Sequence, residues 1–202
     1  MANKHTIIFI PGLGDETTVL RLITRHWRMY GLEPVVYSVG WHDGEDSFRL
    51  KLARLEKMID QLAKNGDRVS LVGTSAGGSA ALNAFIERKN KVHRVINVCG
   101  RLRVGPTTGF RSFASKTKSS PAFAQSVRLC EQSIKRLAVA DRKKIMTVHA
   151  MFGDELVPPE TTIIEAAHNT QVPTMEHMVS IGAALTVFSK RLISFLITRN
   201  KF

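Results

Sequence analysis

The sequence predicts an α/β fold in which a mainly parallel sheet of about six strands carries helices on both faces. Short apolar runs alternate along the chain with longer stretches in which apolar residues recur every three or four positions. This alternation is typical of strands joined by crossover helices. The apolar runs are continuous, which indicates that both faces of the sheet are covered. A length of 202 residues with 44% hydrophobic residues suits a single domain, spanning 1–202, with a sizeable core.

Six apolar runs have the length expected of strands. They are 6–10, 34–39, 68–72, 92–98, 145–151 and a short run near 171–173. Between them, helical periodicity predicts helices over 17–30, 46–64, 75–88, 122–137 and 180–198, and a helical stretch over 163–167. The helix over 75–88 is rich in Ala and Gly, which suits close packing against a sheet.

The segment 101–144 interrupts the alternation of strands and helices. It begins with a loop-rich part, and a connection of this length in a compact domain is usually functional, so we expect a short cap over the site. This segment contains eleven basic residues and only two acidic ones, Glu131 and Asp141, so it holds most of the formal net charge of +12. Such a field is compatible with an anionic substrate.

Ser75 is the candidate nucleophile. Residues 73–77 read G-T-S-A-G, directly after an apolar strand and at the start of a helix. This context is that of a nucleophile elbow, a strained strand-to-helix turn in which the flanking glycines avoid clashes with neighbouring backbone. The helix N-terminus also favours negative charge that develops beside the serine. A Gly/Ser-rich turn without chemistry is the alternative, and the strand and helix on either side argue against it.

A serine nucleophile needs a base, and the base needs an acid to orient it. Asp154 follows the strand over 145–151, where the acid is expected in chain order. No Asp or Glu occurs between Glu87 and Glu131, which removes an acid at the end of the preceding strand. Glu155 competes for the same role, because either carboxylate could face the base.

His177 is the candidate base. Only His168 and His177 follow the acid in the chain, and His177 lies between the last short strand and the last helix, from where it can reach the sheet edge. His168 is the alternative, but it lies at the end of the helical stretch over 163–167 and resembles a helix-terminal residue.

An oxyanion hole usually takes one N–H from the residue after the nucleophile and a second from the loop after the first core strand. Ala76 supplies the first amide. The loop over 11–15 reads P-G-L-G-D, and its glycines let the backbone turn an amide inward, so Leu13 is the expected second donor.

The motifs together resemble those of the α/β-hydrolase superfamily, in its small, single-domain serine esterase and lipase-like form. The resemblance covers nearly the whole chain, through IIFIPGLGD at 7–15, GTSAGG at 73–78, GDELVPP at 153–159 and EHMVSI at 176–181. It implies a minimal α/β-hydrolase fold that starts at what resembles the family's third strand. It also implies a Ser, Asp and His triad, an acyl-enzyme intermediate and hydrolysis of carboxylic esters or related acyl compounds. Serine at the elbow favours acyl transfer over dehalogenation.

A binding module is the alternative function. The basic segment could make the protein bind an anionic surface, such as lipid or nucleic acid, on a hydrolase scaffold with weak or lost catalysis. Aromatic residues among the basic ones are few, namely Phe110, Phe113 and Phe123, and no nucleic-acid motif is present, so we expect no nucleic-acid partner.

No apolar run approaches the roughly 18 residues of a membrane span, and the run over 7–10 is broken at once by Pro11. We therefore expect a cytoplasmic protein. Cys99 and Cys130 are expected to be reduced thiols. No Cys/His spacing suggests a metal, and no cofactor is expected.

Overall fold

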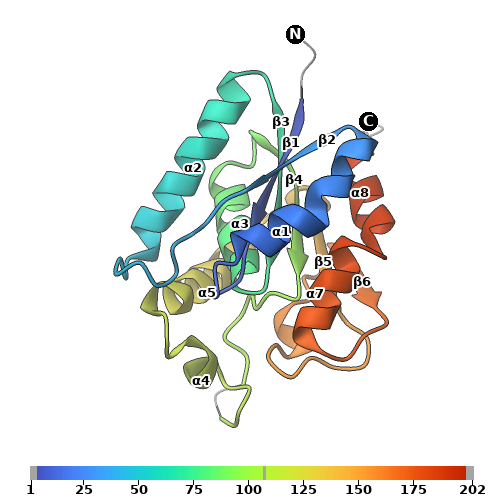
Figure 1. Ribbon diagram of the computed structural model, residues 1–202. Coiled ribbons are helices and arrows are strands. Elements are labelled where there is room, and N and C mark those ends of the chain that lie inside the picture. Colours follow the sequence, from blue (N-terminus) through green and yellow to red (C-terminus); the bar gives the residue numbers. More distant parts are fainter. Residues whose placement is uncertain (1–3, 107, 199–202) are drawn as a thin grey trace.

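Six parallel strands form one sheet in the order β2-β1-β3-β4-β5-β6 (Figure 1). The computed structural model describes residues 4–106 and 108–198. The strands are β1 (His5–Ile10), β2 (Leu32–Val36), β3 (Arg68–Thr74), β4 (Val92–Val98), β5 (Ile145–Ala150) and β6 (His168–Val172). The helices are α1 (Thr17–Thr24), α2 (Phe48–Lys64), α3 (Ala76–Glu87), α4 (Phe113–Thr117), α5 (Pro121–Ile134), α6 (Val139–Arg142), α7 (His177–Leu185) and α8 (Ser189–Ile197), with 3₁₀ turns η1 (Arg25–Tyr30) and η2 (Pro159–Thr161). The predicted α/β sheet is confirmed.

Helices cover both faces of the sheet, as predicted (Figure 1). Successive side chains of a strand point to opposite faces. On β1, Ile8 and Ile10 pack with α2, α3 and α5, whereas Ile7 and Phe9 pack with α1, η1, α7 and α8. All four side chains are fully buried, which explains why the apolar runs are continuous.

The strand order places a switch point between β1 and β3. From β1 the chain crosses to the edge strand β2 and then returns to β3 on the other side of β1. In open α/β sheets, ligands bind outside the carboxyl ends of the strands at such a point. Ile10 pairs in register with Gly73, so the loop after β1 and the turn at Ser75 meet there.

Two predicted helices are broken in the structure. The helix predicted over 17–30 ends at Thr24 and continues as η1, which Gly31 closes with a left-handed φ of 74°. The helix predicted over 180–198 begins earlier, at His177, and is interrupted between Leu185 and Ser189. In the part of the chain described, no single helix is long and apolar enough to span a membrane; α7 and α8 together pass by length and composition but are bent by 54°.

The prediction of a helical stretch over 163–167 was wrong. This segment is a loop, and His168, expected at a helix end, begins β6. The side chain of Asn169 accepts a hydrogen bond from the backbone N of Ile164 and donates to the backbone oxygens of Ile164 and Ala167. These side-chain bonds occupy backbone groups that a helix would use.

The segment 101–144 divides into two parts. Its main helix, α5, buries one face against α3 and serves as the crossover between β4 and β5, as part of the core. Ser79 and Ser126 are hydrogen-bonded across this contact at 2.8 Å, and Asn83 donates to the backbone oxygen of Ser126. The expected cap is therefore confined to the residues before α5, which include α4.

Candidate active site

The turn that carries Ser75 has the geometry of a nucleophile elbow. Ser75 lies between β3 and α3 with φ 51° and ψ −121°, a conformation that L residues rarely adopt. A Cβ at Gly73 would lie 2.2 Å from the backbone oxygen of Gly77, and one at Gly77 would lie 2.1 Å from that of Ile10. Glycine on both sides of the serine is therefore required for α3 to pack this closely against β1 and β3.

Ser75, His177 and Asp154 form a hydrogen-bonded series. The Nε2 of His177 lies 2.9 Å from the Oγ of Ser75, and its Nδ1 lies 2.7 Å from an Oδ of Asp154. This geometry fits an imidazole that donates from Nδ1 to Asp154 and accepts the Ser75 hydroxyl at Nε2. The imidazole and the carboxylate are both almost fully buried, whereas Ser75 is partly accessible. The structure thus brings together three residues singled out in the sequence.

Asp154 is held by both of its oxygens. Oδ2 faces His177, and Oδ1 accepts from the backbone N of Leu156 and of Val157, each at 2.8 Å. Burial by itself raises the pKa of Asp154, but the hydrogen bond and charge of His177 and the two amides outweigh it. The net effect lowers the pKa of Asp154 below its usual range, which favours the carboxylate.

Neither alternative from the sequence, Glu155 as the acid or His168 as the base, belongs to this hydrogen-bonded series. Glu155 accepts a hydrogen bond from the backbone N of His177 at 3.0 Å and fixes the start of α7 rather than the ring. His168 begins β6, at the edge of the sheet opposite to Ser75, and its ring lies 5.1 Å from that of Phe195.

Asp15 was not singled out in the sequence, yet it anchors the loop that carries Leu13. It has a left-handed φ of 52°, and its carboxylate accepts from the backbone N of Val39 at 3.2 Å and of Gly40 at 2.9 Å. Its own N donates to the oxygen of Gly12, which closes a turn around Leu13. The signal was present in the sequence, because an Asp after Gly-rich residues often stabilises turns.

Two hollows meet at Ser75. One is a cleft of about 330 Å³ between α1 and α7, bordered by Ser75 and His177 and lined mostly by apolar side chains. The other, of about 60 Å³, lies beside Leu13 and Ala76, the expected oxyanion donors, and is also bordered by Arg101. The cleft can take an apolar part of a ligand next to the nucleophile.

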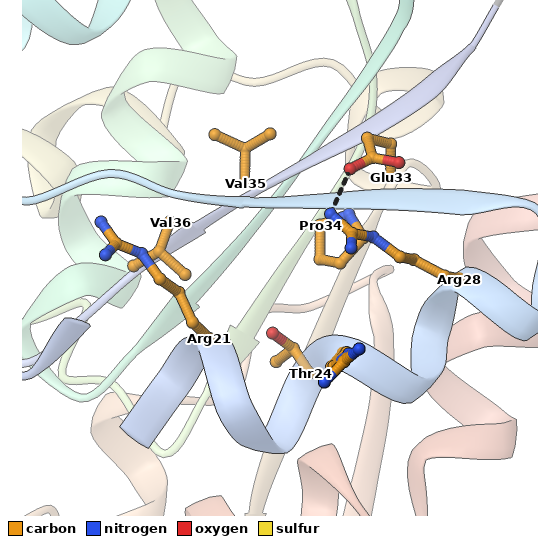
Figure 2. A pocket seen from close by; sticks show the side chains of 8 residues that line it. Arg21, Thr24, Arg28, Glu33, Pro34, Val35 and Val36 are labelled. Atoms are coloured by element: carbon orange, nitrogen blue, oxygen red, sulfur yellow. Dashed lines mark hydrogen bonds and ion pairs between the residues drawn. The ribbon is translucent and has the colours of Figure 1, made fainter. Parts of the chain in front are cut away.

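A separate hollow of about 430 Å³ lies along the edge strand β2 (Figure 2). Arg28 and Glu33 form an ion pair across it at 2.7 Å, and Arg21 and Val36 also line it (Figure 2). The hydroxyl of Thr24 donates to the backbone oxygen of Leu20 within α1. The residues that line this hollow along β2 include no pairing of a nucleophile with a base, so the Ser75 cleft is the candidate active site.

The two cysteines, Cys99 and Cys130, are both free and buried, and burial raises the pKa of each thiol. Among the described residues, no group of three or more His, Cys, Asp or Glu is arranged to hold a metal ion.

No protein-family model and no curated protein matches the sequence. Solved structures match over nearly the whole chain. A monoacylglycerol lipase from Paleococcus ferrophilus has a TM-score of 0.68 at 14% identity, covering 96% of this chain and 95% of its own. Est1E from Butyrivibrio proteoclasticus and the thioesterase domain of the curacin biosynthetic pathway each have a TM-score of 0.64 at 14% identity. Each match covers 96% of this chain, together with 90% of Est1E and 92% of the thioesterase domain. The chain therefore has the α/β-hydrolase fold.

Proposed function

We propose that this protein is a serine hydrolase that cleaves carboxylic esters or related acyl compounds through an acyl-enzyme intermediate. The observation that carries the proposal is the buried series from Asp154 through His177 to Ser75, with Ser75 on a strained turn at the switch point of the sheet. Nucleophile, base and orienting acid at hydrogen-bond distance are the arrangement that acyl transfer requires.

In the first half of the reaction, the Oγ of Ser75 attacks the acyl carbon while Nε2 of His177 takes the hydroxyl proton. The carbonyl oxygen gains negative charge, which the amides of Leu13 and Ala76 stabilise. As the tetrahedral intermediate collapses, His177 gives its proton to the leaving alcohol, and the acyl group stays on Ser75.

In the second half, water attacks the acyl-enzyme while His177 again acts as base. The acid product leaves, and the proton returns to the Oγ of Ser75. Asp154 keeps the Nδ1 proton in place and stabilises the imidazolium in both halves. Glu155 and Asp15 act as positioning residues through the backbones of His177 and of the Leu13 loop.

The matched structures support this class of reaction, since they include a lipase, an esterase and a thioesterase. The apolar cleft beside Ser75 supports a substrate with an apolar part. Because the matched structures include a lipase and an esterase, we propose carboxylic esters as the substrate class, as in an enzyme of carboxylesterase or lipase type.

A fluorophosphonate probe tests the proposal directly. We expect the probe to label the protein once per chain, and mass spectrometry of the digested protein to find the label on Ser75, because only an activated serine attacks such a probe. Denatured protein is the control and should remain unlabelled. Absence of label on Ser75 in folded protein would favour the alternative, an anionic-surface binding protein without catalysis.

Acidification should reveal the interactions of Asp154 in the folded state. A carboxyl whose folded pKa is lowered adds stability above its unfolded pKa and loses it as the pH falls through the folded pKa. Asp154 is such a group. We expect the difference in free energy of unfolding between the unmodified protein and Asp154→Asn to shrink between about pH 5 and about pH 3. Urea unfolding at constant ionic strength measures it, and a difference that grows on acidification would contradict the assigned contacts.

A further inference from the structure

Arg101 is a buried cation next to the Ser75 site. It follows β4 at the edge of the sheet where Ser75 lies, and only 1% of its surface is exposed. Its Nη2 donates to the backbone oxygen of Arg111 at 2.5 Å. Within residues 4–106 and 108–198, its Nε and Nη1 have no hydrogen-bond partner. Buried donors are normally paired, so Arg101 retains hydrogen-bonding capacity that the folded chain does not use.

Arg101 is one of the residues that line the small hollow beside the nucleophile. This hollow, of about 60 Å³, is lined by Ser75, Ala76 and Leu13 and by two cations, Arg101 and Lys116. One water molecule needs roughly 10–15 Å³ of such space, so the hollow has room for more than a single oxyanion. Both charged side chains that line it are positive, and its position adjoins the bond to be cleaved.

No acidic side chain neutralises Arg101 at close range in the described part of the chain. Glu160 acts on it electrostatically but is exposed and forms no ion pair with it. Burial lowers the pKa of Arg101, yet a guanidinium stays charged at neutral pH. A buried cation without a counter-ion is unfavourable for folding. Its placement is explained if the counter-ion arrives with a ligand.

We propose that Arg101, assisted by Lys116, binds a carboxylate of the substrate, so that the preferred esters carry an apolar part and a carboxylate on opposite sides of the scissile bond. This inference rests on the proposed hydrolase function. The cleft between α1 and α7 takes the apolar part, and the hollow at Arg101 takes the carboxylate. A charge-assisted hydrogen bond to a buried guanidinium is strong and directional.

Matched ester pairs test the proposal. One pair differs in the acyl part, p-nitrophenyl hydrogen glutarate against p-nitrophenyl valerate, and the other in the leaving group, 3-carboxy-4-nitrophenyl against 4-nitrophenyl butyrate. We expect the ratio of kcat/KM, anionic over neutral, to fall by about 30-fold in Arg101→Gln for one of the two pairs. Measurement in about 0.5 M NaCl screens the surface charges and leaves the buried pair largely unaffected.

Arg103→Gln is the matched control. It removes the same charge from the same segment, and Arg103 donates to the backbone oxygen of Glu160 at 3.2 Å, outside the residues that line the hollow. Its ratio should stay within about twofold of the unmodified protein. Arg101→Lys keeps the charge, which guards against a folding defect in the Gln variant, and should give an intermediate ratio. Circular dichroism melting checks the fold of each variant.

Unchanged ratios for both pairs in Arg101→Gln would overturn the proposal. This includes an equal loss of kcat/KM with the anionic and the neutral ester, which would show a general effect on the reaction.

If the protein cleaves no ester and takes no fluorophosphonate label, the proposed function fails. A binding measurement then tests whether Arg101 forms an anion site. Calorimetry with monomethyl glutarate on Ser75→Ala should then give an affinity at least about tenfold higher than on Ser75→Ala with Arg101→Gln. Equal affinities, or no binding to either, would overturn the anion site as well.

Discussion

Replacing Ser75 by Ala is expected to lower kcat/KM for p-nitrophenyl butyrate by roughly 10⁴-fold to 10⁶-fold. The variant removes the atom that would form the proposed acyl-enzyme, and the proposed oxyanion amides of Leu13 and Ala76 would by themselves recover only a small part of the rate. The fold should persist, because Ala keeps the Cβ of Ser75 and, among residues 4–106 and 108–198, the hydroxyl is hydrogen-bonded only to His177. Ser115→Ala, an exposed serine in α4, serves as the control and should keep full activity.

A second substitution separates chemistry from folding. Ser75→Gly also removes the nucleophile, but glycine adopts the φ of 51° without strain. We expect Ser75→Gly to melt at a temperature no lower than Ser75→Ala while being equally inactive. Retention of more than a tenth of the activity in either variant would remove Ser75 from the mechanism.

The elbow was predictable from the sequence because its constraints are local. Gly73 and Gly77 are required by contacts of about 2 Å with neighbouring backbone, and these contacts follow from any tight strand-to-helix turn. That Asp154 and His177 lie close to Ser75 was predictable, because parallel strands bring successive loops to one edge of the sheet. The sheet itself followed from the continuous apolar runs.

Contacts between distant segments were not predictable. The sequence could not show that α5 packs on α3 through Ser126, so its helix was expected within the cap. Nor could it show that Arg101 is buried while Arg103 is only partly buried and Arg111 is exposed, since all three appear as charges in one basic segment. Helix breaks, such as the one after Leu185, depend on tertiary packing that overrides periodicity.

The choice between two adjacent carboxylates is the second decisive test. Asp154→Asn is expected to lower kcat/KM by about 10⁴-fold, because an amide cannot stabilise the imidazolium and can favour the wrong tautomer of His177. Glu155→Gln should cost less than about tenfold, since the amide oxygen of Gln can still accept the hydrogen bond from the backbone N of His177.

Both substitutions remove one negative charge at neighbouring positions and preserve side-chain size, so each controls for the other. Kinetics with p-nitrophenyl butyrate at one pH, together with melting temperatures, separate a catalytic defect from unfolding. The structure places an oxygen of Asp154 2.7 Å from Nδ1 of His177, whereas Glu155 contacts only the backbone N of that residue. A larger loss in Glu155→Gln than in Asp154→Asn would transfer the role of orienting acid to Glu155 and would require the loop over 153–157 to rearrange when substrate binds.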